Sequence, residues 1–209
     1  GLDMLKTAEE NYSLITEHLQ RVRDLTEQAA NGTYGADSKA AIKSEITARL
    51  SEIDRISATA EFNGIALMSG TGTTRTLQVG IDKTANSKIV LTADLFAGAD
   101  STKLLGKAAA AFAADCTTTS ADQLEKIDTA IKTISTRVTS IGAAQNRVES
   151  AISAISVQSE NLTSSLSTIK DADVAQESSS YIKAQILQQA SATLLATANQ
   201  LPSIALNLL

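Results

Sequence analysis

The sequence predicts a mainly α protein: an elongated, coiled-coil-like helical bundle with a small β-hairpin region and a C-terminal extension helix. Three observations predict this fold class. Aromatic residues make up only 3% of the chain, and one proline occurs in 209 residues. Apolar residues also recur in alternating steps of three and four between 122 and 173. Because proline breaks helix interiors and aromatic residues build thick cores, this composition favours long helices with thin aliphatic cores.

The longest helix is expected between 122 and 173. One seam position of every heptad is apolar: Ile127, Ile134, Ile141, Val148, Ile155, Leu162 and Ile169. A second series consists of Leu124, Ile131, Val138, Ile152 and Leu166, with polar interruptions at Gln145 and Ser159. Such a regular repeat is typical of a coiled-coil helix.

Two further helices are expected before residue 60. The first carries the series Leu5, Ala8, Tyr12, Ile15, Leu19 and Val22, and it ends at the loop "ANGTYGADS". The second should begin near Asp37 or Ser38, since either side chain can cap a helix. It carries Ile42, Ile46, Leu50, Ile53 and Ile56 and ends before Asn63-Gly64, a strong turn pair.

The apolar period changes to two between about 73 and 95, which predicts a β-hairpin. One strand would place Leu77, Val79 and Ile81 on one face; the other would use Ile89, Leu91, Ala93 and Leu95. Residues 98–120 read as a connector with a short helix. A last helical block from Asp173 should lose its regularity near Pro202. We therefore expect a bundle domain at 1–164 and a C-terminal helix domain at 165–209.

Composition and motifs exclude several function classes. The net charge is −5, with no basic patch, which disfavours nucleic-acid binding. His18 and Cys116 are the only residues of their types, so no His-based triad or multi-thiolate metal site can form. The carboxylates Glu52, Asp54, Asp171 and Asp173 read as solvated helix faces or caps. We expect no enzyme activity, no cofactor, no membrane span and no signal peptide.

The C-terminal block is apolar on more than one side. Its apolar side chains are Ile182, Ile186, Leu187, Leu194, Leu195, Leu201, Ile204, Leu206, Leu208 and Leu209. A helix that is apolar around much of its circumference is normally enclosed. No other segment of this sequence offers a matching partner, so we expect another molecule to cover it.

Six segments, taken in order, resemble bacterial flagellin and cover most of the chain apart from the hairpin and residues 98–120. They are "LQRVRDLTEQAANGT", "SEIDRISATAEFNGIALMSG", "TLQVGI", "IGAAQNRVESAI", "NLTSSLSTIKDADVAQESSSYIKAQILQQA" and "ATANQLPSIALNLL". The similarity begins part-way into the family's N-terminal helical segment, so we expect the part that pairs with the C-terminal helix to be missing. Only the connector stands where many flagellins insert outer domains, which implies a minimal form.

The resemblance implies a structural subunit that polymerises into the extracellular flagellar filament for motility, exported without a cleavable signal peptide. It implies an assembly and chaperone-binding surface on the C-terminal helix, formed by Ile186, Leu187, Leu194, Leu195, Leu201, Ile204, Leu206, Leu208 and Leu209. The implied partners are other copies of the chain, an export chaperone, and the filament cap and junction proteins.

The resemblance also implies recognition by the host toll-like receptor that senses flagellin, with contacts at Arg21, Leu25 and Glu45. Two alternatives stay open at this point. A hook–filament junction protein shares the terminal helices, and a coiled-coil adaptor or secretion-needle-like module would explain the heptads but not the hairpin motif.

Overall fold

The computed structural model describes the backbone of residues 1–68, 70, 72–170 and 174–207, and the side chains of these residues except 175 and 200–207. The chain forms two units, Gly1–Ser156 and Val157–Leu209. The predicted mainly α architecture, with long helices and a small hairpin region, is confirmed. The predicted division at 164/165 concerns roles in a filament and stays a prediction.

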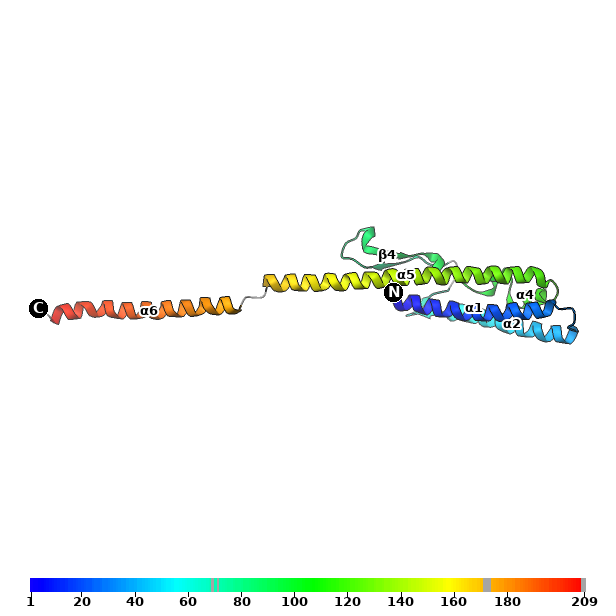
Figure 1. Ribbon diagram of the computed structural model, residues 1–209, viewed down its shortest axis with the longest axis horizontal. Helices are drawn as coiled ribbons and strands as arrows, with labels where there is room; N and C mark the ends of the chain where they lie inside the picture. Colours follow the sequence, from blue (N-terminus) through cyan, green and yellow to red (C-terminus); the bar gives the residue numbers. More distant parts are fainter. Residues whose placement is uncertain (69, 71, 171–173, 208–209) are drawn as a thin grey trace. The chain divides into compact units, whose positions relative to one another are not determined.

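Three long helices build the first unit: α1 (Leu2–Ala30), α2 (Ala36–Thr59) and the part of α5 (Ser120–Lys170) up to Ser156 (Figure 1). Arg23 of α1 pairs with Asp128 of α5, whereas Gln145 of α5 donates to Glu9 of α1. These two contacts show that α5 runs antiparallel to α1, because the later residue of α1 meets the earlier residue of α5.

Helix α2 begins slightly earlier than the sequence predicts. Its N-cap is Gly35, and no side chain caps it, so neither Asp37 nor Ser38 takes the predicted capping role. Asp37 lies in the first helical turn instead. A carboxylate there still interacts favourably with the exposed N–H groups of the helix N-terminus.

The aliphatic core lies between these helices. All six residues of the predicted α1 series and all five of the α2 series are buried, as are Ile127, Ile134, Ile141 and Val148 of α5. Burying each aliphatic side chain of this size contributes about 1.5–3 kcal/mol before ordering costs. We call the helices of the first unit the bundle. The burial of these apolar side chains stabilises it.

The second seam line of α5 differs from the prediction. Gln123, Ala130 and Ala144 are buried, whereas Leu124, Ile131 and Val138 of the predicted series are only partly buried. Ala130 and Ala144 lie three residues after the main seam residues Ile127 and Ile141, whereas the predicted second series lies four residues after each seam residue.

Two hairpins follow α2. Strands β1 (Glu61–Phe62) and β2 (Ile65–Ala66) are joined by Asn63 and Gly64, which have φ angles of 50° and 73°. Two positive φ values in a two-residue loop are the signature of a type I′ turn, for which Asn-Gly is the preferred pair. The sequence predicted this turn but not the two short strands beside it.

The larger hairpin pairs β3 (Arg75–Gln78) with β4 (Lys88–Leu91) in antiparallel fashion, with Leu77 opposite Ile89. Ile81 was predicted to share a face with Leu77, but it is 91% exposed. The prediction is wrong here because β3 ends at Gln78, so the alternation no longer applies. Two 3₁₀ turns, η1 (Ala85–Ser87) and η2 (Ala93–Phe96), flank β4.

The connector contains two short helices, α3 (Ser101–Leu105) and α4 (Ala109–Cys116). Asp54 of α2 accepts hydrogen bonds from the backbone N–H of Ser101 at 2.6 Å and from its hydroxyl at 3.0 Å. Asp54 therefore binds the first residue of α3 from the neighbouring helix, while the N-cap of α3 is Asp100. Ser57 donates to the carbonyl of Met68 and accepts from the N–H of Ala99. These contacts fix the connector to α2.

The second unit contains the last part of α5 and α6 (Val174–Asn207). The predicted loss of regular helix near Pro202 is wrong, because α6 continues to Asn207. Proline removes one N–H and crowds the preceding turn, but helices can continue beyond it when the remaining bonds are kept.

Candidate assembly and recognition surfaces

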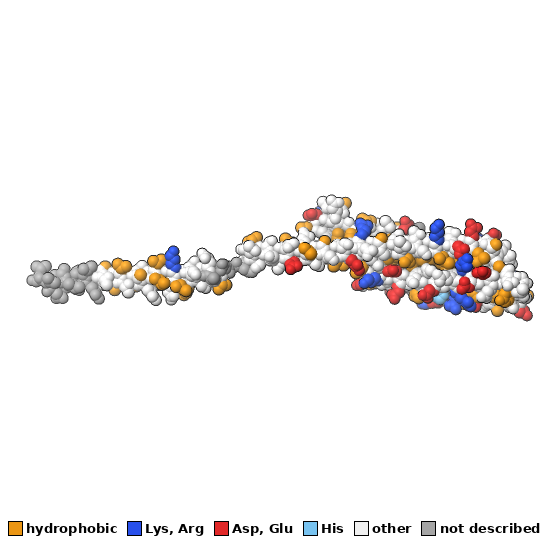
Figure 2. Space-filling model, viewed as in Figure 1, with side chains coloured by type: hydrophobic (Ala, Val, Ile, Leu, Met, Phe, Trp, Pro, Cys, Tyr) orange, Lys and Arg blue, Asp and Glu red, His pale blue; other side chains and the backbone are white. Residues whose placement is uncertain are grey.

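An exposed apolar surface covers much of α6. We define the α6 patch as Ile186, Leu187, Leu194 and Leu195, whose side chains are between 59 and 69% exposed. At about 100° per residue these four positions span roughly half of the helix circumference. Only Glu177 and Lys183 are charged between 174 and 199, and Figure 2 shows apolar side chains gathered on this segment. Such a surface is typical of an interaction site.

The remaining predicted assembly residues lie further along the chain. Leu201, Ile204 and Leu206 fall on the backbone of α6, but their side chains are outside the described residues. Leu208 and Leu209 lie wholly outside the described residues, as do the carboxylates Asp171 and Asp173. The roles of these five apolar residues in assembly stay a prediction.

The coiled-coil seam of α5 also becomes exposed towards its end. The exposed members of the seam are Ile152, Ile155, Leu162, Leu166 and Ile169. Earlier in the helix the main seam residues, from Ile127 to Val148, are buried, and members of the second series such as Ile131 and Val138 are partly buried. The repeat therefore continues as an unpaired apolar stripe among the residues that the structure describes.

The predicted receptor residues divide between surface and core. Arg21 and Glu45 meet at the surface, where both Nε and Nη2 of the guanidinium lie 2.9 Å from Glu45 Oε1. Arg49 also approaches this carboxylate, at 3.9 Å. Leu25 is only 2% exposed and packs in the bundle core. The structure therefore joins Arg21 with Glu45 and places Leu25 beneath the surface.

A second ion pair lies close to Arg21 in sequence. Arg23 Nε donates to Asp128 Oδ1 of α5 at 2.7 Å, and Arg23 also pairs with Glu27. The hydrogen bond with Asp128 raises the pKa of Arg23, so its guanidinium stays charged. Exposed pairs of this kind contribute little to stability, but they set the pattern of charge that a partner would meet.

Among the described residues, no group of three or more His, Cys, Asp or Glu side chains could hold a metal ion. Cys116 is buried, and this burial raises the pKa of its thiol to about 11, so it is a poor nucleophile near neutral pH. Glu52 pairs with Arg55, which lowers the pKa of its carboxyl. Among the described helices, none has the length and apolar composition needed to span a membrane.

Comparison with known proteins identifies relatives along the whole chain. Residues 1–73 match the family model of the bacterial flagellin N-terminal helical region, and residues 124–209 match that of the C-terminal helical region. Flagellins of Bacillus subtilis and Halalkalibacterium halodurans are both 36% identical over 100% of this chain, covering 77% and 75% of their own lengths.

Solved structures agree with the sequence relatives. The crystal structure of Bacillus cereus flagellin superposes with a TM-score of 0.61 at 25% identity. The match covers 78% of this chain and 90% of that one.

Proposed function

Because the chain belongs to the bacterial flagellin family and is a structural subunit of the flagellar filament, we propose that the α6 patch is its assembly surface. The single observation that carries the proposal is the exposure of four large aliphatic side chains on a helix with almost no charge. Their burial between copies would contribute about 1.5–3 kcal/mol per side chain before ordering costs. Head-to-tail contacts that do not close generate a helical tube.

The same surface gives a reason for an export partner. Before polymerisation the patch would favour aggregation, so we propose that a flagellar export chaperone covers α6 until the subunit reaches the growing tip. The filament cap and the junction proteins would then contact the same helix at the two ends of the filament. Leu201, Ile204, Leu206, Leu208 and Leu209 would extend the patch.

An assembly experiment tests the patch. The variants are made in the gene product carrying this chain. Leu194→Asp places a charge within the patch, whereas Gln189→Asp places the same charge on the other side of α6. We expect Leu194→Asp to abolish filament growth from seeds and Gln189→Asp to retain it, with the thermal unfolding of the bundle unchanged in both. Normal filaments from Leu194→Asp would contradict the proposal. Short caps or rings instead of long filaments from the unmodified gene product carrying this chain would favour a hook–filament junction protein.

We also propose that the Arg21–Glu45 pair is part of a surface for the toll-like receptor that senses flagellin. The observation that favours this role is a planar guanidinium held at the surface by a carboxylate on the neighbouring helix. Leu25 would act indirectly, by packing into the bundle core from the buried face of α1 and so fixing the position of that helix. The coiled-coil adaptor alternative does not require this surface.

A signalling assay tests the receptor surface. Arg21→Ala should raise the concentration needed for half-maximal receptor signalling without changing the helicity of the protein. Arg55→Ala is the matched control, because Arg55 is also an exposed arginine in a surface pair, with Glu52. Equal dose responses for Arg21→Ala and the unmodified protein would remove Arg21 from the receptor surface.

A further inference from the structure

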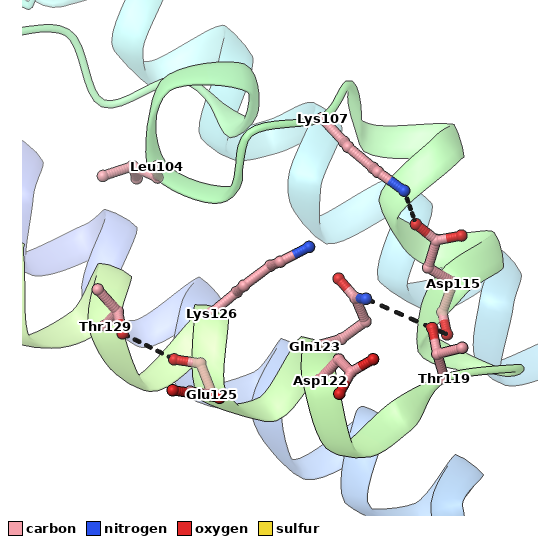
Figure 3. A pocket seen from close by; sticks show the side chains of 9 residues that line it. All are labelled: Leu104, Lys107, Asp115, Thr119, Asp122, Gln123, Glu125, Lys126 and Thr129. Carbon is pink, nitrogen blue, oxygen red and sulfur yellow. Dashed lines mark hydrogen bonds and ion pairs between the residues drawn. The ribbon is translucent and has the colours of Figure 1, made fainter.

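A cleft of about 720 Å³ lies between the start of α5 and the connector (Figure 3). Leu104 and Lys107 line it from the connector, and Gln123 and Lys126 line it from α5. Asp115 of α4 forms an ion pair with Lys107 at one wall. The assembly and receptor surfaces described above do not use these residues.

The amide of Gln123 is oriented by its neighbour. The hydroxyl of Thr119 donates to the carbonyl of Asp115 at 3.2 Å, so its oxygen is left to accept. Gln123 must therefore present its nitrogen to Thr119, and Nε2 donates at 3.4 Å. This arrangement leaves the carbonyl oxygen of the Gln123 amide on the side of the cleft (Figure 3).

That carbonyl oxygen has no hydrogen-bond donor among the described residues. The side chain of Gln123 is only 3% exposed, so bulk water does not compensate for the missing bond. Buried polar atoms without a partner are rare in native proteins, and a specific one calls for a physical explanation. A donor supplied from outside the chain provides that explanation.

The charges around the cleft indicate the kind of donor. Lys107 is already bound to Asp115, whereas Lys126 reaches into the cleft and forms no ion pair within the described part of the chain (Figure 3). The carboxylates of Asp122 and Glu125 also belong to the lining, but they point away from the space between the two lysines. An anionic group that carries a neighbouring N–H would satisfy both Lys126 and Gln123.

We propose that this cleft binds an acidic side chain of a second copy of the chain. The carboxylate pairs with Lys126, and the Gln123 side chain turns further into the cleft so that its amide oxygen accepts from a backbone N–H of the same segment. A second copy fits because the chain is a filament subunit, so other copies lie against it. Each copy also carries more acidic than basic residues, 23 against 18. The inference rests on that filament role and adds a polar contact to it, separate from the α6 patch.

Carbodiimide cross-linking of isotopically mixed filaments tests the contact directly. Filaments are grown from equal amounts of ¹⁴N- and ¹⁵N-labelled gene product carrying this chain, and cross-linked peptides are identified by mass. We expect Lys126 to be joined to Asp or Glu in mixed-isotope pairs, which arise only between copies. Filaments in which Lys126 forms only like-isotope pairs, or none, would overturn the inference while leaving the filament role intact. Failure of the unmodified protein to form filaments would overturn both.

A substitution of Gln123 shows whether this side chain contributes to contacts between copies or to the stability of a single copy. Gln123→Met should leave the melting temperature of the isolated chain unchanged or higher, because it removes an unpaired buried acceptor. It should raise the critical concentration for filament growth about tenfold, the effect of one hydrogen bond. Gln145→Met is the matched control, because Gln145 donates to Glu9 within the chain. A lower melting temperature for Gln123→Met with an unchanged critical concentration would overturn the inference.

Discussion

Tyr12 and Arg137 bind the same carbonyl oxygen. The Tyr12 hydroxyl donates to the carbonyl of Ala97 at 2.8 Å, and Arg137 Nη1 donates to it at 3.3 Å and to the carbonyl of Gly98 at 3.2 Å. The guanidinium carbon lies 5.8 Å from the centre of the Tyr12 ring. This cluster joins α1, α5 and the segment before α3 in one partly buried contact. Burial also raises the pKa of Tyr12, so its hydroxyl stays protonated and able to donate.

Tyr12→Phe should destabilise the bundle. It keeps the ring but leaves the Ala97 carbonyl with a single donor in a partly buried site, which should lower the free energy of unfolding by about 1 kcal/mol. Urea unfolding followed by circular dichroism measures the change. Tyr34→Phe is the control, because the Tyr34 ring is partly exposed in the α1–α2 loop and should tolerate the loss of its hydroxyl. Equal stability of both variants would contradict a stabilising role for the hydrogen bond from Tyr12 to the Ala97 carbonyl.

Gly72 should tolerate no side chain. Its φ angle is +82°, and a Cβ atom would lie 2.0 Å from the carbonyl oxygen of Ala93. Gly72→Ala should therefore lower the free energy of unfolding by more than about 2 kcal/mol. Gly64 has a similar φ of +73° but open space around it, so Gly64→Ala should cost about 1–2 kcal/mol from backbone strain alone. A smaller loss at Gly72 than at Gly64 would show that the contact with Ala93 is relieved.

Asp54→Ala should loosen the connector. It removes the acceptor for both the N–H and the hydroxyl of Ser101, so we expect a loss of about 1–2 kcal/mol in the free energy of unfolding. Hydrogen exchange at Ser101 should accelerate at the same time. Glu52→Ala is the control: Glu52 pairs only across the exposed surface with Arg55, and its loss should leave the unfolding midpoint nearly unchanged. An unchanged hydrogen-exchange rate at Ser101 in Asp54→Ala would contradict a protecting role for the hydrogen bonds between Ser101 and Asp54.

Cys116 should resist alkylation until the protein unfolds. Its thiol pKa is about 11 in the folded protein, against an ordinary value of 9.0, because burial disfavours the thiolate. At pH 8 iodoacetamide should react quickly with the urea-unfolded chain and slowly with the native one. Comparable rates in the two states would contradict the burial of this thiol.

The same shift gives a dependence of stability on pH. Above pH 9 the unfolded chain loses the thiol proton while the folded chain keeps it, so ionisation favours unfolding. The contribution of Cys116 is therefore fully present below pH 9 and is lost as the pH rises towards 11. The stability of the native protein should fall relative to Cys116→Ala over this interval, as urea unfolding at several pH values would measure. A constant difference would contradict the shifted pKa.

Local patterns predicted much of the fold. The heptads from Ile127 to Val148 and the series in α1 and α2 are buried as expected, because a helical repeat fixes which face is apolar. The Asn63-Gly64 turn was predictable because few other pairs adopt two positive φ values. Ile81 was misplaced because alternation does not reveal where a strand ends.

Long-range polar contacts could not be predicted in this way. Tyr12 and Ala97 are far apart in the sequence, and no local period connects them. The sequence also gave no sign that Ala130 would lie closer to the core than Ile131, because burial there depends on how near the neighbouring helix approaches. The free amide oxygen of Gln123 follows from the hydrogen bonding of Thr119, which only the folded geometry reveals.

The most direct test of the central claim is thiol labelling of Leu194→Cys in monomers and in filaments. If the α6 patch is covered by other copies, a maleimide reagent should label Cys at position 194 quickly in monomers and much more slowly in filaments. The buried Cys116 should stay unlabelled in both forms and serves as an internal control. Equally fast labelling of position 194 in well-formed filaments would contradict the claim that the α6 patch is an assembly surface.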